Sequence, residues 1–197
     1  MTQSTMTGET TIGIDLGDRR SHICVLSSEG EVLERAEVPT TVKDMTFGAR
    51  PDPQPIGTNF CMANPNTSGT TGSISTFGFT TVADNDVTLT TSNLPLNSFG
   101  FFIVSPDTAF VMNLADSSGN LCLGGAIGRY VGPGEVQTTG MTGGFSLNID
   151  LTQIPTPTGP AAVVAGETRA FRAWHRDVLP GGGSNSNFTD GLEIRAN

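Results

Sequence analysis

From Thr58 onwards the chain repeats short runs of alternating apolar and polar residues, each ending at a cluster of Gly, Pro, Asn, Asp or Ser. Alternation with a period of two is typical of strands that bury one face, and the clusters supply turns. About nine strands at near-regular spacing predict a mainly β protein, an antiparallel β-sandwich of jelly-roll type. The expected strands are Ser73–Val82, Asp86–Ser92, Ser98–Ser105, Ala109–Asn113, Leu121–Val131, Phe145–Leu151, Ala161–Ala165, Thr168–Asp177 and Gly191–Ala196.

The first forty residues have a different pattern. An apolar strand over Thr11–Gly17, a second over Ile23–Leu26 and a third over Glu31–Val38 are separated by turns, and Pro39 ends the third. The spacing predicts a three-stranded β-meander within residues 1–42. Alternating prolines in residues 43–56 favour extended, unpaired chain, so this segment is expected to be a linker to a sandwich over residues 57–197.

Two segments of the predicted sandwich are unusual. The run from Phe99 to Val104 is apolar at every position except Gly100, which predicts a central strand that packs on both faces. The stretch from Thr158 to Asp177 contains the only Trp and predicts two strands around a turn at Gly166. In its second strand Phe171, Ala173 and His175 alternate with Arg172, Trp174 and Arg176. We expect Trp174 in or near the core, and Arg172, Arg176 and Asp177 at the rim.

Composition and charge make some classes of function unfavourable. The net charge of −9 and the sequence pI near 4.5 disfavour nonspecific binding to nucleic acid or to an anionic membrane. No apolar run of about 18 residues occurs, so we expect no membrane insertion. Residues 1–11 lack the basic start and apolar stretch of a signal peptide, although the low Lys content and the many Thr and Asn residues are typical of exported proteins.

Three cysteines are present. Cys61 and Cys122 are expected to form a disulfide if the protein matures in an oxidising compartment, and otherwise to be separate buried thiols. The disulfide would stabilise the fold by roughly 4 kcal/mol in the loop-entropy model. Cys24 lies in an apolar run and is expected to be a small core residue.

Polar and aromatic residues combine at two places in a way that suits a carbohydrate site. Arg129 and Tyr130 form one pair, and residues Trp174, His175, Arg176 and Asp177 form the other. An aromatic face can stack on a sugar while Arg and Asp bond its hydroxyls. The alternative is structural: a sandwich of this size needs a large core residue such as Trp174. His175 and Asp177 could be a base and its orienting group, or a structural polar pair.

Oxygen-rich turns provide the candidate metal sites. Asp116 and Asn120 in one loop, and residues 84–86 in another, have spacing that a Ca²⁺ loop can use, but ordinary Asx turns explain them as well. Apart from this Ca²⁺ we expect no cofactor. Asn66 and Asn187 begin N-glycosylation patterns.

The N-terminal segment resembles the start of the DEDD-type insertion-sequence transposases of the one-ten group. The resemblance is in Ile12–Asp18, Ser21–Leu26, Gly30–Val32 and Val38–Thr41. It implies an RNase H-like fold in which Asp15 is the first ligand of a two-Mg²⁺ site acting on a phosphodiester. No helix–strand alternation follows Val42 to supply the further carboxylates, so the resemblance implies a truncated, inactive transposase fragment.

Residues 57–197 resemble a module found at the C-terminal end of large exported bacterial proteins. The resemblance is in Gly57–Cys61, Asn93–Pro95, Phe99–Phe102, Gly119–Leu123, Ile127–Tyr130, Asp150–Thr152, Pro155–Gly159, Gly166–Thr168, Ala173–Asp177 and Ser186–Leu192. It implies an extracellular or cell-surface location and no assigned reaction. The chain would be cytoplasmic if it is not exported.

The leading hypothesis is therefore a non-catalytic, cell-surface-type β-sandwich module for adhesion, with a glycan or a protein as its partner. The main alternative is a DNA transposition protein that uses Asp15. A hydrolase would need a nucleophile beside His175.

Overall fold

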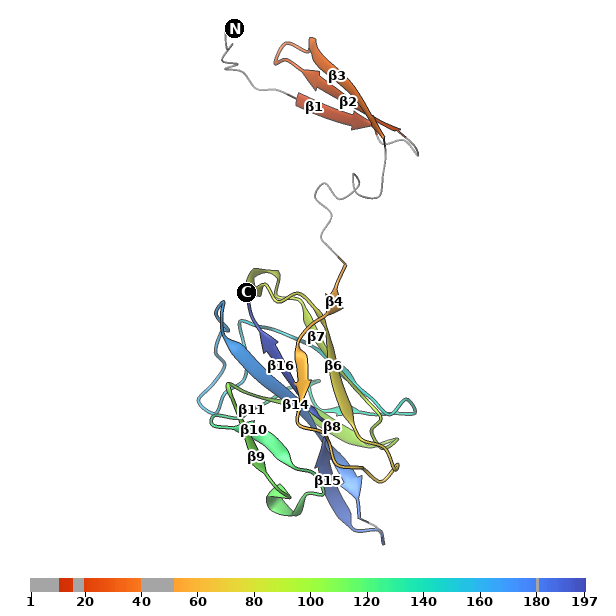
Figure 1. Cartoon of the computed structure of the whole chain (residues 1–197), viewed down its shortest axis with the longest axis vertical. Helices are drawn as coiled ribbons and strands as arrows, with labels where there is room; N and C mark the ends of the chain where they lie inside the picture. Colours follow the sequence, from red (N-terminus) through yellow and green to blue (C-terminus); the bar gives the residue numbers. More distant parts are fainter. Residues whose placement is uncertain (1–10, 16–19, 40–51, 180) are drawn as a thin grey trace. The chain divides into compact units, whose positions relative to one another are not determined.

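A computed structural model describes residues 11–15, 20–39, 52–179 and 181–197, without the side chains of Asp15, Pro39 and Asp116. The chain divides into two compact units, Met1–Asp52 and Pro53–Asn197, and each is described by itself (Figure 1). The predicted linker boundaries at residues 43–51 lie outside the described residues.

The N-terminal unit is an antiparallel sheet of three strands in the order β1–β2–β3. Its strands are β1 (Thr11–Asp15), β2 (Arg20–Leu26) and β3 (Val32–Pro39). The predicted meander is therefore present, while its assignment to an RNase H-like fold stays a prediction. Cys24, expected in a core, is free and only half-buried, because a lone three-stranded sheet has no second layer among the described residues to cover it.

The larger unit contains two main sheets, both antiparallel. The large sheet has the order β11–β8–β14–β16–β5, with β12 also paired to β8 and β15 to β14. The small sheet has the order β13–β7–β6–β4. The strands are β4 (Gln54–Pro55), β5 (Thr58–Phe60), β6 (Ser73–Gly78), β7 (Val87–Ser92), β8 (Phe99–Ser105), β11 (Gly128–Arg129), β12 (Gln137–Thr138), β13 (Ser146–Ile149), β14 (Thr168–Val178), β15 (Ser184–Phe188) and β16 (Gly191–Arg195).

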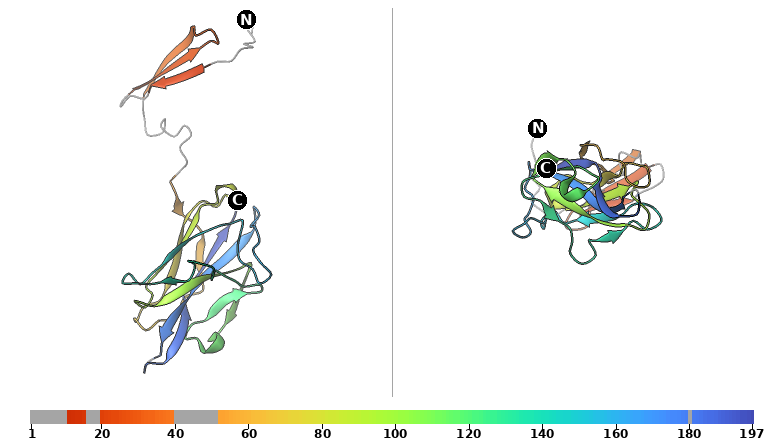
Figure 2. Two further views of the ribbon diagram at one scale, coloured as in Figure 1. Left: turned by 180° about the vertical axis from the view of Figure 1, so that it is seen from behind. Right: turned by 90° about the horizontal axis from the view of Figure 1, so that it is seen from below.

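The two sheets pack face to face around the main hydrophobic core. Val87 and Leu89 of β7 join Phe102 of β8, Phe171 of β14 and Leu192 of β16 in one buried cluster. Figure 2 shows the same sheets from behind, with β14 to β16 in blue. The predicted antiparallel β-sandwich is thus confirmed. We call the face of the large sheet that joins this core the inner face, and the opposite one the outer face.

A third layer covers part of the outer face. Strands β9 (Asp107–Val111) and β10 (Leu121–Gly124) form a two-stranded sheet, with a short 3-10 helix η3 (Leu114–Asp116) between them. Leu121 and Leu123 of β10 pack on Ile103 of β8 and Phe188 of β15 in a second buried cluster. Some residues that point away from the main core, such as Ile103 and Phe188, are therefore also shielded from solvent.

Several predicted strands need correction. Ala161–Ala165 is not a strand: Ala161 makes an isolated bridge to Ile154, while Val163 is a buried core residue within irregular chain. The run predicted as Leu121–Val131 is two shorter strands, β10 and β11, and another 3-10 helix, η2 (Val82–Asp84), follows β6. Strand β15 was not predicted, because its sequence Ser-Asn-Ser-Asn-Phe has no apolar alternation. β4 lies in part of the predicted linker, at residues 54–55.

Candidate binding groove

A groove opens on the outer face of the large sheet beside the β9–β10 layer. Its volume is about 210 Å³. We call it the outer-face groove. It is lined by Phe101, Ile103, Leu114, Ala115, Leu121, Ile127, Arg129, Trp174, Ser186 and Phe188. The lining is mostly apolar, which is the usual composition of a ligand site.

Two stacked aromatic side chains form the floor of the groove. Phe101 and Trp174 are direct partners across the β8–β14 pair, and their ring centroids lie 5.0 Å apart at an interplanar angle of 27°. Phe99 adds a third ring, 6.1 Å from Trp174. Trp174 and Phe101 are half-buried and Phe99 is 43% exposed. The aromatic row is therefore open to solvent, whereas stacked aromatic pairs of a core are closed off.

Glycine at position 100 allows the strands that carry these rings to lie together. A Cβ atom at Gly100 would lie 2.5 Å from the carbonyl oxygen of Trp174 and 2.9 Å from the ring of Phe145. Both distances are too short for a real side chain. A glycine between two outward-facing phenylalanines thus sets the close approach of β8 to β14.

Two exposed arginines stand at the edges of this row. Arg129 on β11 is opposite Ile103 and is the one charged side chain among the described residues that line the groove. The guanidinium carbon of Arg176 lies 5.7 Å from the ring centroid of Phe99, as in a cation–π contact. The groove therefore combines flat apolar surface with cationic hydrogen-bond donors.

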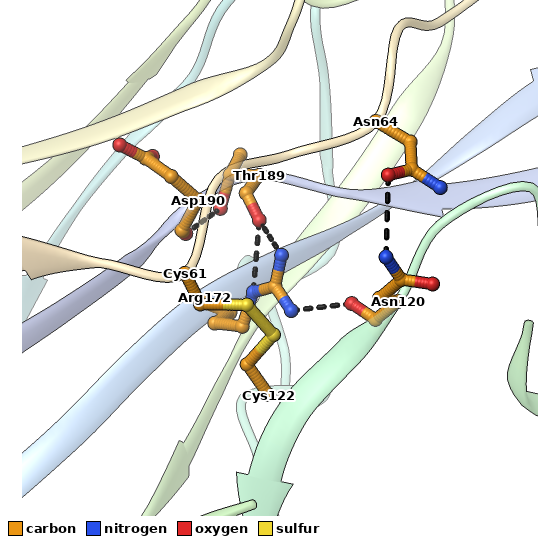
Figure 3. Close-up of a disulfide and its surroundings, with 7 residues drawn as sticks. All are labelled: Cys61, Asn64, Asn120, Cys122, Arg172, Thr189 and Asp190. Carbon is orange, nitrogen blue, oxygen red and sulfur yellow. Dashed lines mark hydrogen bonds between the residues drawn. A yellow bond between two sulfur atoms is a disulfide. The ribbon is translucent and has the colours of Figure 1, made fainter. Parts of the chain in front are cut away.

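Behind the groove Arg172 is fully buried, contrary to its predicted place at the rim. Its Nε donates to the carbonyl oxygen of Thr189 at 2.8 Å, Nη2 donates to the same oxygen, and Nη1 donates to the carbonyl oxygen of Asn120 (Figure 3). Its guanidinium carbon lies 5.4 Å from the ring centroid of Phe188. Burial lowers the pKa of Arg172 to about 10, while the charge of Asp190 acts in the opposite direction.

The predicted disulfide is present next to this arginine. Cys61, which follows β5, and Cys122 of β10 are bonded, and Figure 3 shows Arg172 between them and the carbonyl oxygens. Cys122 and Leu123 are 1% exposed. The disulfide therefore ties the third layer, which forms one wall of the groove, to the edge of the large sheet.

Three of the predicted binding residues lie away from the groove. Tyr130 is 3% exposed and belongs to the main core, so the adjacent residues Arg129 and Tyr130 point to opposite faces. Its hydroxyl has no hydrogen-bond partner within the part of the chain that the structure describes, and its pKa is raised mainly by burial and also by Glu135 and Asp150. His175 and Asp177 are buried on the inner face of β14.

His175 and Asp177 do not form a hydrogen-bonded pair. The Nδ1 of His175 lies 3.2 Å from the carbonyl oxygen of Arg176, and its buried Nε2 has no hydrogen-bond partner among the described residues. Burial lowers the pKa of His175, opposed by the Arg176 carbonyl and by the charge of Asp177. Asp177, predicted at the rim, is buried because its carboxylate accepts hydrogen bonds from the backbone N–H and hydroxyl of Thr67. Its contacts are those of a residue that positions a loop.

The asparagines of the two N-glycosylation patterns are also buried and hydrogen-bonded. Asn187 is fully buried, and its amide donates to the carbonyl oxygen of Pro65 at 3.1 Å. Asn66 is 6% exposed and donates to the carbonyl oxygen of Asn93 at 2.7 Å. Neither amide is accessible in the folded protein.

The candidate metal ligands do not converge among the described side chains, where no group of three or more His, Cys, Asp or Glu residues is placed to hold a metal ion. Asn120 donates from its amide to Asn64 at 3.2 Å, and the side chain of Asp116 lies outside the description. Asn85 bonds Asp150 and the backbone N–H of Leu151, as in a structural turn. Asp15 ends β1 opposite His22, and its role as a Mg²⁺ ligand stays a prediction.

Most residues of the groove, including Phe101, Ile127 and Phe188, were not predicted from the sequence. The sequence contained part of the signal for an apolar site, because the run from Phe99 to Val104 has apolar residues that point to both faces of the strand. We interpreted this as a fully packed central strand. The third layer covers only some of the side chains that point outward from this strand, and the others line the groove.

Within the described part of the chain, no helix has the length and apolar character needed to span a bilayer. Comparisons with protein-family models, with curated proteins and with solved structures find no match for this chain.

Proposed function

We propose that residues 53–197 form a non-catalytic binding module of the secreted or cell-surface type, and that the outer-face groove is its glycan-binding site. The observation that carries the proposal is the solvent-open stack of Phe101 and Trp174 with Arg129 at its edge. Isolated apolar residues are common on protein surfaces, whereas contiguous exposed apolar surface is typical of ligand-binding grooves and interaction sites.

The chemistry of the groove suits a sugar ring. A pyranose has a face of C–H groups and an edge of hydroxyls, so it needs a flat apolar surface next to hydrogen-bond donors. Trp174 and Phe101 offer the surface, while the guanidinium of Arg129 offers N–H donors in a planar arrangement. Ser186, which also lines the groove, adds a hydroxyl.

The described lining residues favour binding without catalysis. General acid–base chemistry needs a group that exchanges a proton near neutral pH. The side chains described as lining the groove include no His, Asp, Glu, Cys or Lys. His175, the candidate base, lies on the inner face, so it is separated from the groove by the sheet itself.

The disulfide supports the proposed compartment. Disulfides form and persist mainly in oxidising environments such as the cell exterior. The bond between Cys61 and Cys122 closes a sequence separation of 61 residues and ties the third layer, which forms one wall of the groove, to the edge of the large sheet. A module that matures outside the cytoplasm would therefore have the site intact.

A glycan array tests the proposal. We expect the protein to retain a defined set of glycans and Trp174→Ala to weaken that binding by about tenfold or more, since a base–aromatic stack is worth about 1–3 kcal/mol in comparable nucleic-acid sites. Trp174→Phe keeps an aromatic face and should restore part of the affinity. Phe77→Ala is the matched control, because Phe77 is 48% exposed on β6 of the small sheet.

Circular dichroism establishes that each variant is folded. An array without any bound glycan, or binding that survives Trp174→Ala in folded protein, would contradict the proposed function.

A further inference from the structure

We infer, on the basis of the proposed glycan site, that its ligand is an anionic sugar, in which carboxylate or sulfate groups contact Arg129 and Arg176. Charge is distributed unevenly around the groove.

Positive charge is concentrated on one part of an otherwise acidic unit. Residues 53–197 contain ten Asp and Glu residues and only five arginines, namely Arg129, Arg169, Arg172, Arg176 and Arg195. Three of these arginines lie on the outer face beside the aromatic row. Arg172 and Arg176 alternate with Trp174 on β14, and Arg129 is in register with Ile103 and hence with Arg172.

Among the described side chains, the outer-face carboxylate of the large sheet nearest to this row is that of Glu193, which pairs with Ala170 beyond the level of Arg172. In the part of the outer face between the levels of Arg172 and Arg176, the neighbouring positions on β8, β12 and β15 are aromatic, aliphatic or hydroxyl side chains. These positions are Phe99, Phe101, Ile103, Thr138, Ser186 and Phe188. Asp177, next in the chain to Arg176, faces the opposite side and bonds Thr67. The described surface here is therefore positive, although the unit as a whole is negative.

The two exposed guanidinium groups have donors available. Arg129 has no hydrogen bond or ion pair to another described residue, and the recorded contact of the Arg176 side chain is with the ring of Phe99. By contrast, Arg20 is paired with Glu37 at 2.9 Å and Arg169 with Glu167 at 2.8 Å. A guanidinium presents a planar fork that matches a carboxylate or sulfate in two parallel hydrogen bonds.

The spacing of the arginines suits an extended ligand. Arg129 is on β11 and Arg176 is on β14, with β8 between these two strands, and their positions along the strands differ by four residues. The two arginines are therefore separated by roughly 10 Å across the sheet and by roughly 13 Å along the strands. Phe101 and Trp174 lie between them. A short chain of sugars that stacks on these rings would place charged groups within reach of both guanidinium groups.

Buried Arg172 strengthens the field. Its hydrogen bonds go to carbonyl oxygens of Thr189 and Asn120, and no described carboxylate is in ion-pair contact with it. Its guanidinium lies over Phe188, whose ring lines the groove. The charge of Asp190 offsets part of this positive charge, and the remainder, which is screened by protein rather than by water, favours an anion in the groove.

The test compares sugars that differ only in charge. We would titrate the full chain with trigalacturonate and with its uncharged methyl ester, and with a sulfated trisaccharide and its desulfated form. One of the two acids is expected to bind at least about tenfold more tightly than its neutral counterpart. Which acid binds distinguishes carboxylate from sulfate as the source of the charge. Raising the salt concentration should weaken the binding.

Matched variants distinguish the loss of a direct contact with the ligand from a change in the net charge of the protein. Arg129→Gln and Arg176→Gln should each weaken binding of the acid by about tenfold, because a hydrogen bond to a charged group is lost. Arg195→Gln makes the same change in net charge at an exposed arginine near the opposite end of β14, and should leave the affinity unchanged. An equal loss for Arg195→Gln would overturn the inference.

The remaining outcomes distinguish this inference from the proposed function. Equal binding of an acid and its neutral form, still dependent on Trp174, would overturn the anionic ligand and leave the glycan site standing. Binding of neither class would overturn both. Equally tight binding of polyglutamate that survives Trp174→Ala would show a general cationic surface instead of a sugar site.

Discussion

Arg172 donates a 2.8 Å hydrogen bond from its Nε to the carbonyl oxygen of Thr189, and its guanidinium is completely shielded from solvent. The arginine joins the chain after β15 to the loop before β10, since the carbonyl oxygen of Asn120 accepts from the same guanidinium. A buried charge thus connects the large sheet to the third layer.

Replacing this arginine should destabilise the larger unit. Arg172→Met keeps much of the apolar volume but leaves two buried carbonyl oxygens without donors, so we expect a loss of about 3 kcal/mol in the free energy of unfolding. Urea denaturation followed by Trp174 fluorescence measures it. Arg195→Met, at an exposed position, should change stability by no more than about 0.5 kcal/mol. A similar small change for Arg172→Met would show that water can replace the guanidinium.

The disulfide should contribute strongly to stability. Joining Cys61 to Cys122 removes conformational freedom from the unfolded chain, and the double variant Cys61→Ala, Cys122→Ala should lose roughly 4 kcal/mol. Thermal unfolding with and without reductant gives an independent measure. Cys24→Ala is the control, because Cys24 is free and lies in the other unit. If reduction left the melting temperature unchanged, the bond would have no role in stability.

His175 should make stability depend on pH. Its pKa is lowered by burial in the folded protein, whereas the unfolded chain has the ordinary value near 6.5. The unfolded state therefore binds a proton more readily, and stability should fall as the pH drops below about 6.5, by up to about 1.4 kcal/mol per pH unit. Unfolding free energies between about pH 5 and 8 measure this.

The variant His175→Gln isolates this effect, because the acidic groups nearby remain. The difference in stability between the two proteins should vary with pH in the same window. A constant difference would mean that His175 does not titrate in it.

The larger unit should fold without the smaller one. The division after Asp52 assigns all strands of the sandwich to residues 53–197. A protein that begins at Pro53 should therefore keep the melting temperature of the full chain's larger unit. A clear drop in differential scanning calorimetry would show that residues 1–52 stabilise the sandwich.

Much of the fold follows from local patterns. Strands β6, β7, β8, β14 and β16 were predicted within a few residues, since each alternates apolar and polar positions and ends at a turn. β15 escaped because Asn185 and Asn187 are buried through hydrogen bonds rather than through apolar side chains. The apolar run at Ala161–Ala165 was wrongly predicted to be a strand, since Val163 is buried in the core within irregular chain.

The candidate site was only half predictable. Trp174 and Arg129 were named because they belong to polar and aromatic combinations that suit a carbohydrate site, yet Tyr130, His175 and Asp177 were named on the same ground and lie on the inner face. Residue type identifies unusual side chains, but their solvent exposure depends on which layer covers them.

The sequence by itself determined which residues share a face of a strand, because side chains alternate with a period of two whatever the strand pairs with. It thereby placed Arg172, Trp174 and Arg176 together, opposite Phe171 and Ala173. Only the tertiary structure decided that β8 lies beside β14, which brings Phe101 onto Trp174. It also decided that the β9–β10 layer and the disulfide bury Arg172 while Trp174 stays open. Backbone hydrogen bonds between distant segments decide these pairings, and no local pattern encodes them.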